Sequence, residues 1–209
     1  MPVSGVQAAV MNLAVTGTTA AGFLTVHPTG EARPWASTLT FAPNSTVSIR
    51  TMVKVGAGGK VTIFNSSGSS DVVVDIGGWY TDASVAGTLG ALVPVSPARI
   101  LDTRNGTGGV TGPLVAGADV DVQVTGRGGV PASGVRAVVL NATVVSPAAP
   151  GHLTIFPGGT ARPLASDLNF AAGETQANLV VVQLGAGGRV SMAASAGTHV
   201  IFDVAGWIS

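Results

Sequence analysis

Apolar and polar residues alternate along short segments of the chain, and glycine-rich clusters separate these segments. Residues 119–124 alternate strictly between valine and Asp or Gln. A period of two places one kind of side chain on each face, so this pattern predicts a half-buried β-strand. Residues 177–184 form a continuous Val-rich run and residues 200–204 a similar one, as is typical of strands covered on both faces. No stretch of helical length has an amphipathic period of 3.6 residues, and we therefore predict an all-β fold.

A long internal repeat organises the sequence. Residues 4–12 align with residues 133–141, and the same offset aligns Gly-Phe-Leu-Thr-Val at 22–26 with Gly-His-Leu-Thr-Ile at 151–155. An Ala-Arg-Pro triplet and a closing Gly-Trp pair recur in both copies. Short strands with turn signals at regular spacing suggest a sandwich or barrel. The pattern predicts about six strands in the first copy and eight in the second.

The two copies are unequal at their beginnings. The second is preceded by Ala-Arg-Ile-Leu-Asp-Thr-Arg at 98–104 and by the alternating strand at 119–125, whereas the first has neither. We therefore predict two tandem homologous β-sandwich domains, of jelly-roll or immunoglobulin-like topology. Residues 1–82 form a first repeat that lacks its N-terminal strands, residues 83–92 a linker, and residues 93–209 a complete second repeat. The missing strands are either absent or supplied from elsewhere.

Composition excludes several classes of protein. Charged residues are 10% of the chain, against ~25% in typical soluble domains, and the formal net charge is zero. A nucleic-acid partner is not expected without a basic face, and the absence of Cys removes disulfides and thiolate sites. No run approaches the ~20 apolar residues of a spanning helix, so we expect no membrane insertion. No leader pattern follows Met1, and a secretion signal is expected outside these residues.

The motif string of the second copy supports a family resemblance. Its parts are Ala-Arg-Ile-Leu-Asp-Thr-Arg at 98–104, Gly-Arg-Gly-Gly-Val-Pro at 126–131, and the final Gly-Trp. The chain resembles repeat modules of secreted and cell-surface proteins of actinobacteria, often found beside peptidoglycan or polysaccharide hydrolase domains. The resemblance implies a non-catalytic module that is secreted or on the cell surface. The first copy departs from the pattern because it lacks Leu-Asp-Thr-Arg.

Catalytic and metal-binding patterns are not evident. None of the three histidines recurs at an equivalent position, and no hydrolase or zinc motif occurs, so we predict that the chain is not an enzyme. Asp119 and Asp121 share a strand face, where the simpler interpretation is exposure to solvent. No cofactor is expected. A calcium site is the weaker alternative, in which Asp102, Asn105 and loop carbonyls supply oxygen ligands.

Two carboxylates recur inside apolar strands. Asp75 and Asp203 each stand shortly before a Gly-Trp pair. A buried carboxylate has to be paired or hydrogen-bonded, so we predict structural pairs of Asp75 with Arg33 and of Asp203 with Arg162. Arg104 is an alternative partner in the second repeat only. The competing interpretation is that these pairs bind a ligand.

Aromatic residues are few, which limits a sugar-stacking surface. Trp79 and Trp207 end recurring strands and are expected to cap the core. Trp35 follows a turn and is the better stacking platform. The candidate ligand-binding residues are Trp35, Tyr80, Asp102 and Arg104.

Two functions remain open from the sequence. The first is an extracellular repeat module that associates with a cell surface, a cell-wall glycan or another polysaccharide. The alternative is a structural subunit or spacer of an extracellular assembly, whose partners are other copies of the chain. In that version a segment such as 100–104 or 120–125 of a neighbour completes the first domain by strand complementation.

Overall fold

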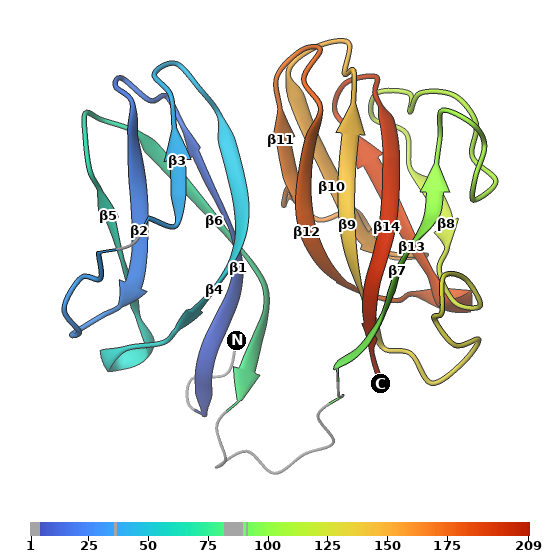
Figure 1. The fold of residues 1–209 in the computed structure, drawn as a ribbon, viewed down its shortest axis with the longest axis horizontal. Coiled ribbons are helices and arrows are strands. Elements are labelled where there is room, and N and C mark those ends of the chain that lie inside the picture. The colour runs from blue at the N-terminus through green and yellow to red at the C-terminus, as the bar shows by residue number, and fades with distance from the viewer. Residues whose placement is uncertain (1–4, 36, 82–89, 91) are drawn as a thin grey trace. The chain divides into compact units, whose positions relative to one another are not determined.

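Antiparallel β-strands make up the fold (Figure 1). The computed structural model describes residues 5–35, 37–81, 90 and 92–209. These residues contain fourteen strands and two single-turn 3-10 helices, Ala57–Gly59 and Ala186–Gly188, so the all-β prediction is confirmed. The chain divides into two compact units, unit 1 at residues 1–88 and unit 2 at residues 89–209. The predicted linker overlaps residues 82–89 and 91, which lie outside the described residues.

Unit 2 is a sandwich of two four-stranded sheets. The first sheet has the order β12-β9-β14-β7, and the second has the order β11-β10-β13-β8. The strands of the first sheet are β7 (Leu92–Asp102), β9 (Ala137–Val145), β12 (Gln176–Gln183) and β14 (His199–Ile208). Those of the second sheet are β8 (Val120–Gln123), β10 (Gly151–Pro157), β11 (Leu168–Phe170) and β13 (Arg189–Ala194).

The pairing of unit 2 follows the order of a rolled-up hairpin. The first strand pairs with the last (β7 with β14), the second with the seventh (β8 with β13), the third with the sixth and the fourth with the fifth. Eight antiparallel strands paired in this order form a jelly roll. Of the two sandwich topologies predicted, unit 2 therefore has the jelly roll. The first two strands, β7 and β8, are the edge strands of the two sheets on the same side of the sandwich.

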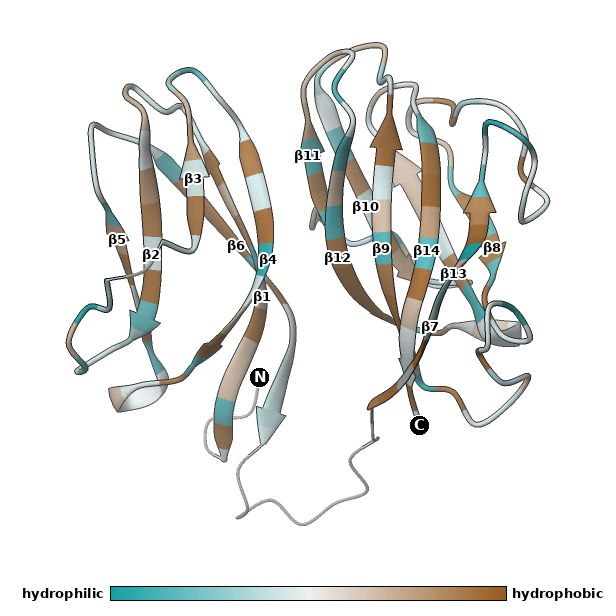
Figure 2. Cartoon of the chain, viewed as in Figure 1, coloured by the Kyte–Doolittle hydropathy of each residue, from teal (hydrophilic) through white to brown (hydrophobic). Residues whose placement is uncertain are grey.

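The apolar faces of both sheets form the core of unit 2. Leu140, Phe202 and Met192 are fully buried there. Figure 2 shows the apolar residues concentrated along β9 and β14. Residues 200–204 have mostly buried side chains, whereas β12 alternates between buried and exposed ones. Burial of residues 177–184 on both faces was therefore a wrong prediction, because one face of β12 points into the sandwich and the other toward solvent.

Unit 1 has six strands, in two three-stranded sheets. One sheet has the order β4-β1-β6 and the other has the order β3-β2-β5. Its core is smaller and centres on Met11, Leu13 and Leu24. The strands of the first sheet are β1 (Val6–Thr16), β4 (Val47–Lys54) and β6 (Asp71–Thr81); those of the second are β2 (Gly22–Pro28), β3 (Leu39–Phe41) and β5 (Val61–Asn65).

The aligned residues of the two repeats have the same strand register. Gly22 pairs with Phe41 in unit 1, and Gly151 pairs with Phe170 in unit 2. A Cβ on either glycine would lie 3.1 Å from the ring of the paired phenylalanine, which explains why glycine recurs. Strands β1 to β6 thus correspond to β9 to β14. No described residue of unit 1 forms a counterpart of β7 or β8.

Equivalent valines provide a matched test of core closure. Val200 in β14 is fully buried, whereas Val72 at the same position of β6 is exposed. Val200→Ala removes two buried methyl groups and should destabilise unit 2 by about 2 kcal/mol. Val72→Ala should destabilise unit 1 by less than ~1 kcal/mol, since the site is already in water. Native-state amide exchange, resolved to peptides of each unit, measures both changes; equal losses would contradict the difference in burial.

Candidate interaction site on unit 1

Strand β7 covers the last strand of unit 2 in two ways. It pairs with β14 from Leu92 to Asp102 and satisfies the outer backbone edge. Its Ile100 and Leu101 are also buried in the core. As a result Val200, Phe202 and Val204 of β14 have no exposed surface.

The equivalent strand of unit 1 has no such cover among the described residues. Val72, Val74 and Ile76 of β6 align with the three buried residues of β14, yet they are 38%, 38% and 49% exposed. The two tryptophans differ in the same direction. Trp207 packs against the core of unit 2 beside β7, whereas Trp79 is half-exposed. The predicted role of capping the core thus applies to Trp207 alone.

The outermost described strand of the second sheet of unit 1 also lacks a covering strand. In unit 2, β8 pairs with β13, and Val122 is buried against it. In unit 1, β5 is the outermost described strand of its sheet, and all five of its residues are half-exposed. We call the outer edges of β6 and β5, with the apolar residues of β6, the uncovered side of unit 1. It is the candidate interaction site.

An ion-pair network holds β7 in place in unit 2. Arg99 donates two hydrogen bonds to Asp203 on β14, of 2.9 Å from Nε and 3.2 Å from Nη2. Its third nitrogen, Nη1, donates to Asp102 at 3.1 Å. Two parallel bonds between a guanidinium and a carboxylate fix geometry as well as charge. Arg99 therefore locks the register between the first and last strands of the roll.

Asp102 is the fully buried carboxylate of this network. It accepts hydrogen bonds from the side chain of Arg104, at 2.9 and 2.7 Å, and from the backbone N–H of the same residue. The side-chain bonds from Arg104 hold the pKa of Asp102 well below its usual range, against the opposing effect of burial. Next to it, the Thr103 hydroxyl accepts the N–H of Val200 at 3.0 Å. The Leu-Asp-Thr-Arg motif thus builds the turn that follows β7.

The Gly-Arg-Gly-Gly motif closes the roll over β7. Gly128 has a φ of +57°, and a Cβ there would lie 2.6 Å from Val204 and 2.8 Å from Ile100. Only glycine combines this backbone conformation with so close an approach. The motifs at 98–104 and 126–131 therefore form one closure, in which strand, turn and glycine loop meet on β14.

The predicted partner of Asp203 was wrong. Asp203 pairs with Arg99, whereas Arg162 donates to Asp119 and to the carbonyl of Gly117. The reason is topological. Arg162 follows β10 in the second sheet, while Asp203 lies on β14 in the first, next to β7. Arg104, the alternative partner, binds Asp102.

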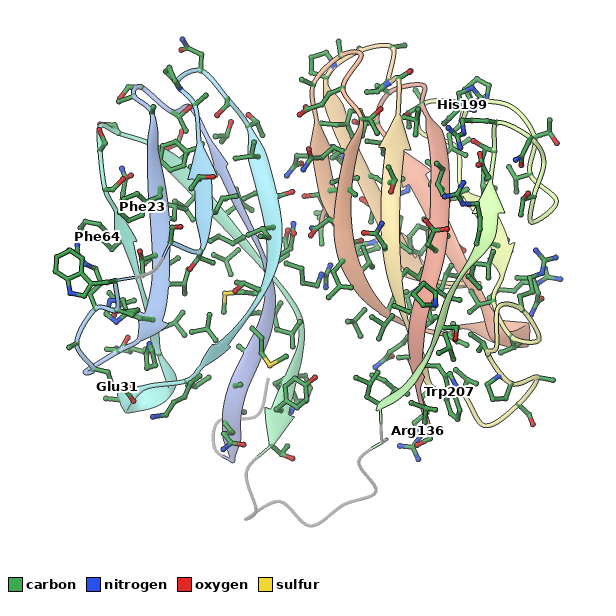
Figure 3. All side chains as sticks on the ribbon, viewed as in Figure 1. Phe23, Glu31, Phe64, Arg136, His199 and Trp207 are labelled. Atoms are coloured by element: carbon green, nitrogen blue, oxygen red, sulfur yellow. The ribbon has the colours of Figure 1, made fainter. Side chains whose placement is uncertain are left out.

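The predicted Asp75–Arg33 pair is also not among the contacts of Arg33. The Arg33 guanidinium lies 3.7 Å from the ring centre of Phe64 and makes a cation–π contact. Phe23 lies beside Phe64, with ring centres 6.3 Å apart, as Figure 3 shows. Asp75 is instead the cross-strand neighbour of Asn12. The equivalent Arg162 of unit 2 binds Asp119 and Gly117, and the described residues of unit 1 contain no counterpart of that segment.

The four candidate ligand-binding residues are divided between the two units. Trp35 is fully exposed in the loop between β2 and β3, and Tyr80 lies half-exposed on β6 in the other sheet of unit 1. Asp102 and Arg104 belong to unit 2 and bind each other. The oxygens suggested for calcium are also engaged, since Asn105 accepts the N–H of Thr107 and Asp102 binds two arginines. Within the described residues, no group of acidic or histidine side chains is arranged for a metal.

Sequence reasoning missed Arg99, the residue that links the two strands. A usable signal was present, because Arg99 belongs to the Ala-Arg-Ile-Leu-Asp-Thr-Arg motif found only before the second copy. The sequence did not show that this motif pairs with the last strand, because that pairing depends on the order of strands in the sheet.

Comparison with protein-family models and with curated proteins gives no match for this chain. Over the part of the chain that the structure describes, no helix has the length and apolar character needed to cross a membrane. The arrangement of the residues themselves therefore carries the functional argument.

The buried carboxylate allows a prediction with a pH dependence. Asp102→Asn removes charged hydrogen bonds and should destabilise unit 2 by about 2 kcal/mol at neutral pH. The pKa of Asp102 is lower in the folded protein than its unfolded value of roughly 4, so its stabilisation is complete above that pH and is lost as the pH falls below it. The variant should therefore lose less stability than the wild type below pH ~4, as measured by urea unfolding.

Asp119→Asn is the matched control, because it breaks an exposed pair with Arg162. We expect a loss below ~1 kcal/mol. Equal effects of the two substitutions would show that burial of Asp102 does not set its contribution.

Proposed function

We propose that the chain is a non-catalytic structural module of an extracellular assembly, joined to that assembly by strand complementation at unit 1. The observation that carries this proposal is the uncovered side, where apolar residues that are buried in unit 2 are exposed in unit 1. Addition of a strand to a sheet edge supplies affinity through backbone hydrogen bonds and specificity through alternate side chains. Strand complementation needs no catalytic side chain, and no histidine recurs at equivalent positions of the two copies.

The composition of β6 supports the same conclusion. Proteins normally protect an edge strand with lysine, proline or a short length. The sequence of β6, Asp-Val-Val-Val-Asp-Ile-Gly-Gly-Trp-Tyr-Thr, is eleven residues long and contains neither lysine nor proline. An edge without these protections suits pairing with another strand. Few surface charges, at 10% of the chain, leave little repulsion against such contacts.

A photo-crosslinking residue at position 76 tests the proposal in the host that makes the protein. We expect Ile76 replaced in this way to form an adduct with a polypeptide, and digestion should map the adduct to one extended segment. Position 52 is the control, because Met52 is similarly exposed but lies on β4, at the opposite edge of the same sheet. No polypeptide adduct at position 76, or the same adduct at both positions, would contradict the proposal.

A second candidate function is association with a cell-wall glycan or polysaccharide. It is favoured by one observation, the complete exposure of Trp35 and of its counterpart Leu164 in equivalent loops. An exposed indole offers a flat apolar face of the kind that sugar rings stack on. Leu164 provides an equally exposed side chain without an aromatic face.

Retention on insoluble cell-wall polysaccharide measures this second function. Trp35→Ala should abolish most of the retention of the full chain, because it removes the stacking face. Leu164→Ala should leave retention unchanged. If the wild type is not retained, or if the two variants behave alike, glycan stacking at Trp35 is rejected.

A further inference from the structure

We infer that the occupant of the uncovered side is the same surface of a second copy of this chain, joined by antiparallel pairing of β6 with β6 about a two-fold axis. This inference rests on the proposed function and names the partner. A two-fold interface brings the same patch of both copies together, so the patch has to be complementary to itself. The side chains, the charges and the two edges of unit 1 meet this condition.

The apolar residues of β6 repeat at every second position. Val72, Val74 and Ile76 point to the inside of the sandwich, because their cross-strand neighbours on β1 are core residues. Antiparallel pairing centred on Val74 places this residue opposite its own copy, and Val72 opposite Ile76 of the partner subunit. A two-fold axis perpendicular to the sheet keeps the inner faces of both copies on the same side. The three apolar side chains of each copy then cover those of the other, as β7 covers β14 in unit 2.

The acidic charge of β6 is balanced from within the chain. Asp75 has an interaction within the chain, and Arg50 and Asn12 are its neighbours in the same row across the sheet. The Arg50 side chain reaches β6, because a Cβ on Gly77 would overlap with its Nη1. In unit 2 the position of Arg50 is occupied by Leu179, and the arginine beside β14 comes from β7 instead. Strand β4 thus supplies to β6 the positive charge that unit 2 takes from β7, and a partner strand does not have to provide one.

The other carboxylate of β6 meets a positive charge in the same arrangement. Asp71 is exposed at the start of the strand. With Val74 at the centre, Asp71 stands opposite Gly77 of the partner subunit, against which that subunit's Arg50 lies. Opposite charges on paired strands are stabilising, and the two-fold axis makes this contact twice. The edge of β6 is therefore complementary to itself in charge as well as in the pattern of its apolar residues.

The same axis brings the second sheets together. Strand β4 packs on β2 and β3 across the sandwich, so β6 and β5 lie at its other side. The sequence of β5, Val-Thr-Ile-Phe-Asn, has no charged residue, and its side chains are half-exposed. Arg33 beside it is already engaged on the ring of Phe64. Pairing of the two β6 edges therefore turns the uncharged edge of β5 toward its own copy, and both sheets are extended across the axis.

Other donors fit less well. Donation of β7 by a second copy would open the core of unit 2, where Ile100 and Leu101 are buried. Pairing of β6 with β6 leaves that core intact. A foreign strand would have to match two edges of different composition, whereas a second copy matches both by symmetry.

Sedimentation of the full chain over a range of concentrations measures the association. We expect a reversible equilibrium between monomer and dimer. Ile76→Asp should raise the dissociation constant at least roughly tenfold, equivalent to about 1.4 kcal/mol, because it puts a carboxylate into the apolar contact. Met52→Asp is the control, since Met52 is similarly exposed but lies on β4 at the opposite edge of the sheet, and the constant should not change. A monomer at every concentration, or equal effects of both substitutions, overturns the inference.

A charge reversal tests the contact between Asp71 and Arg50 of the partner subunit. Asp71→Arg should raise the dissociation constant roughly fivefold, because each dimer then has two repulsive contacts in place of two attractive ones. Asp71 is exposed, so folding of unit 1 is preserved. Asp119→Arg makes the same change of charge in unit 2 and should leave the constant unchanged. An unchanged constant for Asp71→Arg overturns the pairing centred on Val74.

Single cysteines test the register even if Ile76→Asp fails to fold. The chain has no cysteine, so each variant has one thiol. Residues directly opposite in an antiparallel pair have Cα atoms roughly 4.5–5.5 Å apart, which a disulfide can span. Val74→Cys should therefore give a disulfide-linked dimer under mild oxidation. Hydrogen exchange of this dimer, compared with the reduced variant, should show protection in β6 and β5 and no change in unit 2.

Val73→Cys is the matched control on the same strand. Val73 is more exposed than Val74, but the two copies of position 73 are diagonal neighbours, with Cα atoms roughly 7–8 Å apart, beyond the usual reach of a disulfide. It should therefore crosslink much more slowly than Val74→Cys. Crosslinking at neither position, or equally fast at both, overturns the inference.

The two proposals fail differently. An adduct at position 76 that maps to β6 of another copy supports both. An adduct that maps to a different polypeptide rejects the second copy as occupant and leaves strand complementation in place. Absence of any polypeptide adduct, together with a monomer at every concentration, rejects strand complementation itself.

Discussion

The pairing of the first strand of a roll with its last is the interaction on which the rest of this structure depends. In unit 2, β7 gives β14 a hydrogen-bonded neighbour and, through Ile100 and Leu101, a cover for its apolar face. A buried backbone group without a partner and an apolar side chain in water are both costly, so one strand removes two penalties. The contrast between Phe202 and Val74, at the same position in the two units, shows the effect of that strand.

Unit 1 carries substitutions that suit an incomplete sandwich. Phe64 stands where unit 2 has the small, buried Ala193, and it packs against Phe23 and under Arg33. These contacts give the second sheet an aromatic cover on one face, and they engage an arginine whose counterpart binds beside β8. Strand β6 has no comparable arrangement, and its valines remain in contact with solvent. The two edges of unit 1 are therefore not equivalent, and β6 offers the larger apolar surface.

Local patterns in the sequence predicted local features well. The period of two located β8, and the repeat alignment identified residues that occupy equivalent places, such as Gly22 and Gly151. Features that depend on strand order were not accessible. Three arginines were plausible partners of Asp203 by type, but the one that binds it was not among the two considered, because only sheet order places β7 beside β14. Exposure of alternate residues of β12 likewise follows from the packing of its sheet, which covers only one face of the strand.

The ion pairs show why residue type alone did not define a site. Asp102 and Arg104 have the composition of a binding pair, yet their hydrogen bonds are directed at each other and at the turn after β7. The polar groups of the motif at 98–104 therefore stabilise the closed jelly roll. In the function that we propose, recognition depends on backbone edges and apolar side chains, which have no sequence motif of their own.

The distance along the chain between β7 and β14 also sets an order of events during synthesis. The residues that pair in these strands are separated by about a hundred positions. At typical rates of translation, β7 therefore leaves the ribosome roughly 5–20 s before its partner exists. Unit 1, whose last described strand ends at Thr81, is synthesised before β7. Each nascent chain thus exposes β7 as an unpaired strand until β14 emerges.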